Sequence, residues 1–151
     1  MAENTPIAPP FVIHKEYIKD LSFEMPGAPK IFFENNIAVN SEINININAG
    51  KINENLFSLN LHVEINNKNK DDPLFLVDIT YSAVCTINKE GEEEQKRTLL
   101  VDIPYIIFPS VAAIIANITR DSGFPPLILA PVDFAKMFKN SPAAKEISKE
   151  N

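Results

Sequence analysis

Apolar and polar residues alternate with a period of two along four stretches of the first part of the chain. The clearest stretch is residues 57–66, where Phe, Leu, Leu, Val and Ile alternate with Ser, Asn, His, Glu and Asn. Similar alternation occupies residues 11–24, 37–48 and 74–88. Successive side chains on a strand point to opposite faces, so each stretch predicts a β-strand with one apolar and one polar face. Such strands favour an antiparallel sheet with one wet face.

The pattern changes after the fourth strand. The acidic run in residues 89–94 is typical of a solvated loop. Pro109 suits the first turn of a helix, where its missing N–H needs no partner, so we expect a helix from near Phe108 that ends before Gly123. Isoleucine, valine and alanine lie all around it, which indicates burial on every side. It is too short for a bilayer, which needs about 20 apolar residues, so its cover must be protein.

A proline-stiffened apolar loop, residues 124–131, leads to a second short helix. Asp133 is placed to cap the N-terminus of this helix, which begins at Phe134. Phe134, Met137 and Phe138 form an apolar stripe at spacing i, i+3 and i+4. Such a stripe is usually ordinary packing. Aromatic and methionine side chains on flexible support also suit promiscuous apolar binding, so a groove is the alternative.

Four strands followed by two helices predict an α+β domain, with a four-stranded antiparallel sheet and two C-terminal helices. We expect a flexible arm at residues 1–10, one domain at residues 11–140 and a charged tail at residues 141–151. One sheet face covers only one side of the first helix, and each large apolar side chain left outside forfeits roughly 1.5–3 kcal/mol. A second copy of the chain is the economical cover, so we expect a homo-oligomer.

Charge and cysteine content narrow the partners and the compartment. A formal net charge of −6 and a pI near 4.9 argue against nucleic acid, because affinity for phosphate backbones comes from clustered Lys and Arg. The N-terminal residues show no basic start followed by an apolar segment, so we expect a cytoplasmic protein without direct membrane insertion. The single cysteine, Cys85, lies on an apolar strand face and fits a reducing compartment.

The sequence contains no assembled catalytic motif. Its four glycines are widely spaced, which rules out a phosphate-binding loop and a dinucleotide fingerprint. His14, His62 and Cys85 are solitary in sequence, so we expect no metal site and no cofactor. Asp121 and Asp133 bracket the proline loop, but capping explains Asp133 better than acid–base chemistry. We therefore expect a binding protein that is not an enzyme.

Three segments of the chain resemble the SecB family of bacterial protein-export chaperones. They are residues 17–29 (YIKDLSFEMPGAP), the helix start Phe108-Pro109, and residues 123–134 (GFPPLILAPVDF). The resemblance runs in register from about Phe11 to Phe138. It implies a homotetramer, a dimer of dimers with long helices between sheets. It also implies an ATP-independent chaperone that holds unfolded secretory precursors in a translocation-competent state and delivers them to the motor SecA.

The resemblance also implies two sets of site residues. The SecA-docking residues would be Asp20, Glu24, Leu76 and Asp78. Strand alternation independently places Asp20 and Glu24 on one wet face, about 13 Å apart. The client-binding residues would lie between the sheet, the segment after the first strand and the second helix. They are Phe32, Phe33, Phe124, Leu127, Leu129, Phe134, Met137 and Phe138.

Two other functions remain open from the residues alone. A small apolar-ligand-binding module would use a closed cavity and bind one ligand per chain. An oligomeric scaffold or adaptor would bind one folded partner and ignore denatured proteins.

Overall fold

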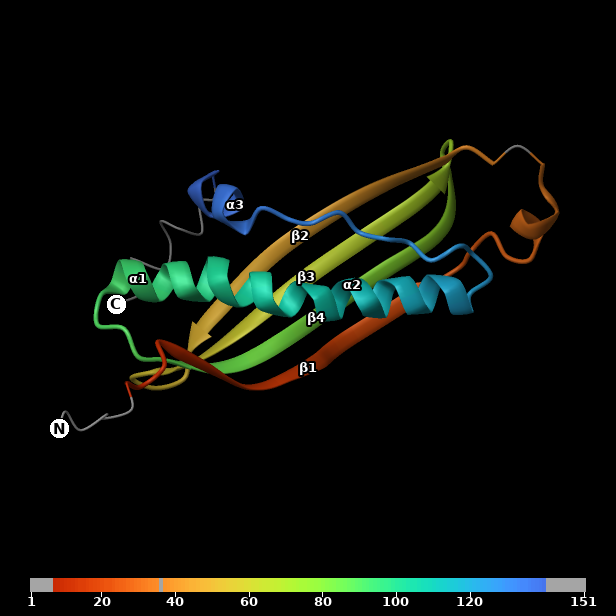
Figure 1. Ribbon diagram of the computed structural model, residues 1–151. Helices are drawn as coiled ribbons and strands as arrows, with labels where there is room; N and C mark the ends of the chain where they lie inside the picture. Colours follow the sequence, from red (N-terminus) through yellow and green to blue (C-terminus); the bar gives the residue numbers. More distant parts are fainter. Residues whose placement is uncertain (1–6, 36, 141–151) are drawn as a thin grey trace.

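The computed structural model describes residues 7–35 and 37–140, so the expected charged tail and most of the expected N-terminal arm lie outside the described residues. The described residues form nine elements, which follow one another along the chain (Figure 1). They are the strands β1 (Phe11–Glu24), β2 (Val39–Lys51), β3 (Leu56–Asn69) and β4 (Asp72–Ile87), the 3-10 helix η1 (Lys30–Phe33), the α-helices α1 (Glu92–Arg97), α2 (Ile103–Asp121) and α3 (Phe134–Asn140), and the π-helical turn η2 (Thr98–Asp102).

The four strands form one antiparallel sheet in the order β1-β4-β3-β2. A tight turn joins β3 to β4, with Lys70 at a φ of 56°. The chain must cross the end of the sheet between β1 and β2, since these strands form its opposite edges. The segment that carries η1 makes this crossing and extends beyond the end of the sheet (Figure 1). The predicted α+β fold with a four-stranded antiparallel sheet is confirmed.

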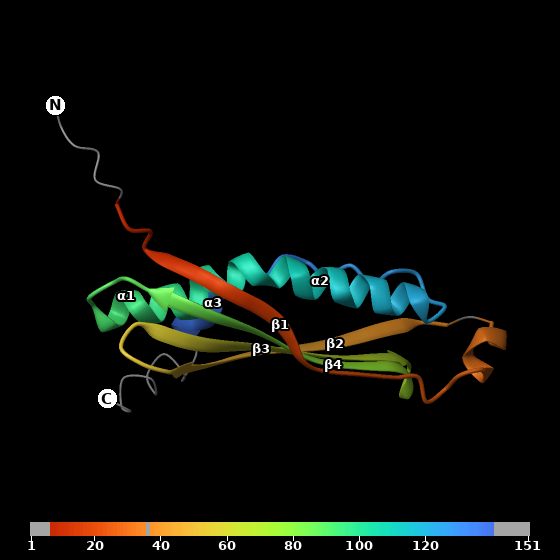
Figure 2. The same ribbon diagram turned by 90° about the horizontal axis from the view of Figure 1, so that it is seen from below.

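One face of the sheet is covered and the other is open. All the helices that follow β4, together with the loop between α2 and α3, lie on the covered face (Figures 1 and 2). The strands contribute Leu59, Leu61, Val63 and Ile79 to the core, each with no exposed surface. The facing residues of α2 recur every four positions, so they form one stripe on the helix. They are Ile103, Ile107, Val111 and Ile115, and all four are fully buried.

The first helix begins much earlier than predicted. Helix α1 starts at Glu92 and continues without a break through η2 and α2 to Asp121. The acidic run expected in a solvated loop is the first turn of α1, where Glu92, Glu93 and Glu94 meet the positive end of the helix dipole. Pro109 lies inside the helix, so the predicted start near Phe108 was wrong. Buried side chains on both sides of Pro109 hold the helix together across the missing hydrogen bond. The predicted end before Gly123 is confirmed.

The helix is longer than predicted, which bears on whether it could cross a membrane and on how much of it is buried. Residues Glu92–Asp121 are long and apolar enough to cross a bilayer by length and composition, but half of the most apolar window is buried within the chain. A core helix of a soluble protein has the same properties. The side of α2 that faces away from the sheet is open in the single chain, where Tyr105 is 70% and Ile106 is 46% exposed. Burial on every side is therefore not achieved by one chain.

Cys85 is fully buried on the covered face, as its position in the alternating pattern predicts. Burial penalises the charged thiolate and raises the pKa of Cys85 to about 11. The thiol is therefore neutral and inert at physiological pH, in keeping with a structural role.

Replacement of Ile107 by alanine tests the core. Ile107 is fully buried between α2 and the sheet, so Ile107→Ala removes packing atoms and leaves a cavity. We expect the free energy of unfolding, measured by urea titration at fixed protein concentration, to fall by about 2–5 kcal/mol. Ile128→Ala removes the same atoms from a side chain that is 77% exposed and is expected to change stability by less than about 0.5 kcal/mol. Equal effects would contradict this assignment of the core.

Candidate functional surfaces

The four residues expected to dock SecA lie together on the open face of the sheet. Strand β1 pairs with β4 so that Asp20 lies opposite Thr80, Ser22 opposite Asp78 and Glu24 opposite Leu76. Residues directly opposite in an antiparallel pair share a face. Val77 and Ile79 point into the core, so their neighbours in β4 point outward. We call Asp20, Glu24, Leu76 and Asp78 the docking patch.

The docking patch borders a hollow of about 400 Å³ on the open face. Glu24, Leu76 and Asp78 line it from β1 and β4, while Glu42 on β2 and Glu64 on β3 close the far side. The Glu42 carboxylate also lies 3.7 Å from the Lys68 ammonium group. Sequence reasoning missed Glu42 and Glu64 as part of this surface. Alternation placed Glu64 on a polar strand face, but only the strand register shows that it lies opposite Asp78.

His62 also belongs to this surface, so it is solitary in sequence but has neighbours in space. It lies two residues before Glu64 on β3, and its Nε2 donates a 2.7 Å hydrogen bond to Oδ1 of Asp78. The same nitrogen lies 3.7 Å from Oε1 of Glu64. These ligand atoms all lie within 4.8 Å of one another, so they are close enough to share a divalent cation. The hydrogen bond to Asp78 already accounts for the geometry without one.

A row of aromatic rings lies at the end of the sheet where β1 leads into η1. Phe23 stacks on Phe75 with ring centroids 5.7 Å apart, Phe75 contacts Phe124 at 5.1 Å, and Phe124 contacts Phe32 at 5.9 Å. We call these four residues the aromatic row. Phe75 within the row is buried in the core, whereas Phe32 at its end is 49% exposed. The adjacent Phe33 is 82% exposed.

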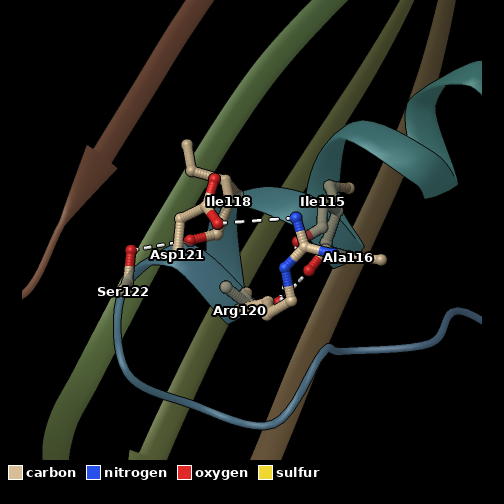
Figure 3. Close-up of polar contacts among 7 residues, drawn as sticks. Ile115, Ala116, Ile118, Arg120, Asp121 and Ser122 are labelled. Carbon is tan, nitrogen blue, oxygen red and sulfur yellow. Dashed lines mark hydrogen bonds and ion pairs between the residues drawn. The ribbon is translucent and has the colours of Figure 1, made fainter.

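The C-terminal end of α2 positions Phe124. Thr119 Oγ1 donates a hydrogen bond to the Ile115 carbonyl at 2.9 Å and accepts one from the Leu127 N–H at 2.9 Å. Ser122 Oγ donates to the Ile118 carbonyl at 2.6 Å, and the Arg120 guanidinium lies 3.5 Å from the Asp121 carboxylate (Figure 3). These contacts fix the turn through which the loop reverses over the covered face.

Helix α3 lies at the other end of α2. Asp133 Oδ1 accepts a hydrogen bond from the Lys136 N–H at 3.0 Å, which confirms the predicted N-cap. Phe134 is buried and packs edge-on against Phe108 with centroids 5.8 Å apart. Met137 and Phe138 are partly buried against the core.

The eight expected client-binding residues therefore do not form one cluster. Phe32, Phe33 and Phe124 lie at one end of α2, and the three residues of α3 lie at the other end (Figure 1). Leu127 and Leu129, both partly buried, lie on the loop between them. Together they follow the path of this loop along the covered face.

The described residues place carboxylates on the open face of the sheet and partly buried apolar side chains on the covered face, an arrangement that favours a binding protein. The family model described as preprotein translocase subunit SecB matches residues 4–145. The chain belongs to the SecB family, and it is a chaperone of protein export, not an enzyme.

Curated relatives agree over most of the chain. It is 39% identical over 131 residues to the protein-export protein SecB of Rhodospirillum rubrum, which covers 87% of this chain and 81% of that protein. It is 38% identical over 136 residues to the protein-export protein SecB of Mesorhizobium japonicum, with 90% and 81% covered.

A solved structure shares the fold. It is a SecB-like chaperone of Mycobacterium tuberculosis in complex with a ChAD peptide from the HigA1 antitoxin. The TM-score is 0.68 at 14% sequence identity, over 81% of this chain and 90% of the other.

Gly123 offers a test of the turn that positions the aromatic row. Its backbone φ is +90°, a value that residues other than glycine rarely adopt. A Cβ atom at this position would lie 3.0 Å from Cε1 of Phe32. We expect Gly123→Ala to lower the free energy of unfolding by about 1–2 kcal/mol in urea titrations, through strain and displacement of the Phe32 ring. Gly50→Ala is the control, because its Cβ would meet only the Ser58 hydroxyl, at 3.4 Å. Equal stability of the two variants would contradict the close approach of Gly123 to the Phe32 ring.

Proposed function

We propose that this chain holds unfolded secretory precursors without ATP and delivers them to the SecA motor. The observation that carries the proposal is the separation of two surfaces by the sheet. Phe75 of β4 points into the aromatic row, whereas the neighbouring Leu76 points into the docking patch. A precursor on the covered side therefore leaves the open face free for SecA.

The client surface would be apolar and extended. Phe32 and Phe33 expose aromatic rings on the segment between β1 and β2. Leu127, Leu129, Met137 and Phe138 continue apolar surface along the covered face, and the buried Phe134 supports α3 from beneath. Several weak apolar contacts on one molecule gain through effective concentration, so no sequence code is required of the precursor.

The docking patch would recognise SecA through complementary charge. Asp20, Glu24 and Asp78 place three carboxylates on the open face, and Leu76 adds an apolar contact beside them. A basic segment of SecA would be attracted over a Debye length of about 10 Å, so the association should weaken as salt is added.

The functional unit would be a cytoplasmic homotetramer arranged as a dimer of dimers. The open side of α2, with Tyr105 and Ile106, leaves apolar surface for a second copy. The edge strand β1 also exposes Tyr17, Ile18 and Leu21 in the single chain. Burial of these side chains between subunits would supply the cover that one sheet does not.

Removal of the exposed rings tests the client surface. We expect Phe32→Ser/Phe33→Ser to weaken binding of a denatured secretory precursor about 10-fold in calorimetry without nucleotide, because two apolar contacts are lost. Ile52→Ser changes a 54% exposed side chain outside this surface and should bind like the wild type. A wild-type protein that ignores denatured precursors would favour a scaffold for a folded partner, and saturable uptake of one small apolar ligand per chain would favour a ligand-binding module.

Charge reversal tests the docking patch. We expect Asp20→Lys/Glu24→Lys to weaken SecA binding at least 10-fold, because attraction becomes repulsion, and to leave precursor affinity unchanged. The measurement is SecA affinity by calorimetry at low salt. Glu54→Lys/Glu90→Lys is the matched control, since both side chains are exposed and the change in net charge is the same. Parallel loss of SecA and precursor binding, or loss of neither, would overturn this separation of roles.

A further inference from the structure

We infer that Asn67 is a further client-binding residue, whose side-chain carbonyl accepts a hydrogen bond from the main chain of an extended precursor segment. The inference rests on the proposed function, because it names the chemical group of the precursor that the client surface takes up. The family resemblance does not imply Asn67. The sheet register brings it to the client surface, where it lies directly opposite Phe75 of the aromatic row.

Asn67 lies on the covered face between the aromatic row and an edge of the sheet. It pairs with Phe75 on β4 and with Ser41 on β2, and residues directly opposite in antiparallel strands share a face. Strand β2 is an edge of the sheet (Figure 1). Val39 and Ile43 lie two residues to either side of Ser41 on the same face, and they are 61% and 43% exposed. Apolar surface therefore continues from the aromatic row to β2, interrupted by one polar pair, Asn67 and Ser41.

The polar pair lacks one hydrogen bond. Asn67 is only 3% exposed. Its Nδ2 donates a 2.8 Å hydrogen bond to Ser41 Oγ, but among the described residues its Oδ1 has no hydrogen-bond partner. A buried carbonyl without a partner lowers the stability of the fold, because the carbonyl has left water without compensation. The covered face thus contains an acceptor that a bound main chain would satisfy.

An unfolded precursor supplies the missing donor at almost every residue. Each residue other than proline carries a main-chain N–H, which has no partner when an extended chain lies on an apolar surface. Aromatic and aliphatic side chains cannot pair with this group. Asn67 Oδ1 can, and it is already removed from water in the free chain, so its pairing requires no further desolvation of the acceptor. Recognition of the main chain also requires no particular precursor sequence.

The polar pair is reached from the edge of the sheet. Ser41 is partly exposed, so a chain that lies between Val39 and Ile43 passes over its hydroxyl group. The torsion that orients an asparagine amide is broad, so a rotation turns Oδ1 of Asn67 toward this edge at small cost. Val39 and Ile43 are about 13 Å apart along the strand, which is the span of four residues of an extended chain. The preferred segment is therefore extended, with apolar side chains on both sides of a free main-chain amide.

Amide-to-ester substitution in a bound peptide tests the hydrogen bond. The probe is a short water-soluble peptide with one phenylalanine flanked by leucines, and its affinity is measured by calorimetry without nucleotide. Replacement of one main-chain amide at a time by an ester removes the N–H of that amide. We expect one ester position to weaken binding to the wild type about 5- to 10-fold, and to weaken binding to Asn67→Leu less than about 2-fold. Any apolar contact added by the leucine is the same for both peptides and cancels in this comparison.

Asn66→Leu is the matched control. Asn66 precedes Asn67 on β3 and lies opposite Leu76, so it points to the open face. Among the described residues its Oδ1 is also buried without a partner. The control therefore makes the same substitution on the other face of the sheet, and its ester penalty should equal that of the wild type. A penalty that persists in Asn67→Leu, as expected if a water molecule satisfies Oδ1, would overturn the inference, and so would its loss in Asn66→Leu.

Stability distinguishes a binding residue from a structural one. Leucine has the branching of asparagine without its polar atoms, so we expect Asn67→Leu to unfold at the same urea concentration as the wild type or a higher one. Asn67→Val is a second apolar variant with a good strand residue, and it takes the place of leucine in the ester comparison if only a smaller side chain fits. Lower urea midpoints for both variants, together with an unchanged ester penalty, would show that Asn67 serves the fold alone.

The same measurements separate this inference from the proposed function. A wild type that binds neither the peptide nor a denatured precursor would overturn both. If Phe32→Ser/Phe33→Ser loses peptide affinity while the ester penalty is equal in the wild type and Asn67→Leu, the client surface stands and only the inference about Asn67 is wrong.

Discussion

The packing of α2 against one face of the sheet determines where every other surface lies. Ile103, Ile107, Val111 and Ile115 are fully buried against the strands, so one face of the sheet is committed to the core. Because side chains alternate along a strand, the residues between the buried ones point to the opposite face, which is open in this chain. Adjacent residues of β4 serve different surfaces for this reason: Phe75 joins the aromatic row and Leu76 the docking patch. The proposed division between client binding and SecA docking follows from this alternation.

Features that depend on local pattern could be predicted from the sequence. The period of two identified the four strands, and the same period placed Asp20 and Glu24 on one face, which the pairing with Thr80 and Leu76 confirms. The N-cap at Asp133 and the end of α2 before Gly123 were also predictable, because a short side chain and a glycine act within one turn.

Features that depend on tertiary context could not be predicted. The helix start at Glu92 was missed for two reasons. An acidic run is typical of a solvated loop, and a proline is typical of the first turn of a helix. Only the burial of the side chains on both sides of Pro109 shows that this proline lies inside a longer helix. His62 appeared solitary because its partner Asp78 is sixteen residues away and meets it only through the β3–β4 register. The expected client residues were placed by the family resemblance, which gives no positions in space, whereas the structure spreads them along the loop from one end of α2 to the other.

Native mass spectrometry of the protein with a denatured secretory precursor and then with SecA, in the absence of nucleotide, tests the central claim most directly. If the two surfaces lie on opposite sides of the sheet, an oligomer loaded with a precursor must still bind SecA. We therefore expect a complex whose mass contains the oligomer, the precursor and SecA together. A precursor-loaded oligomer that cannot take up SecA would contradict the separation of the two surfaces on which the proposed delivery depends.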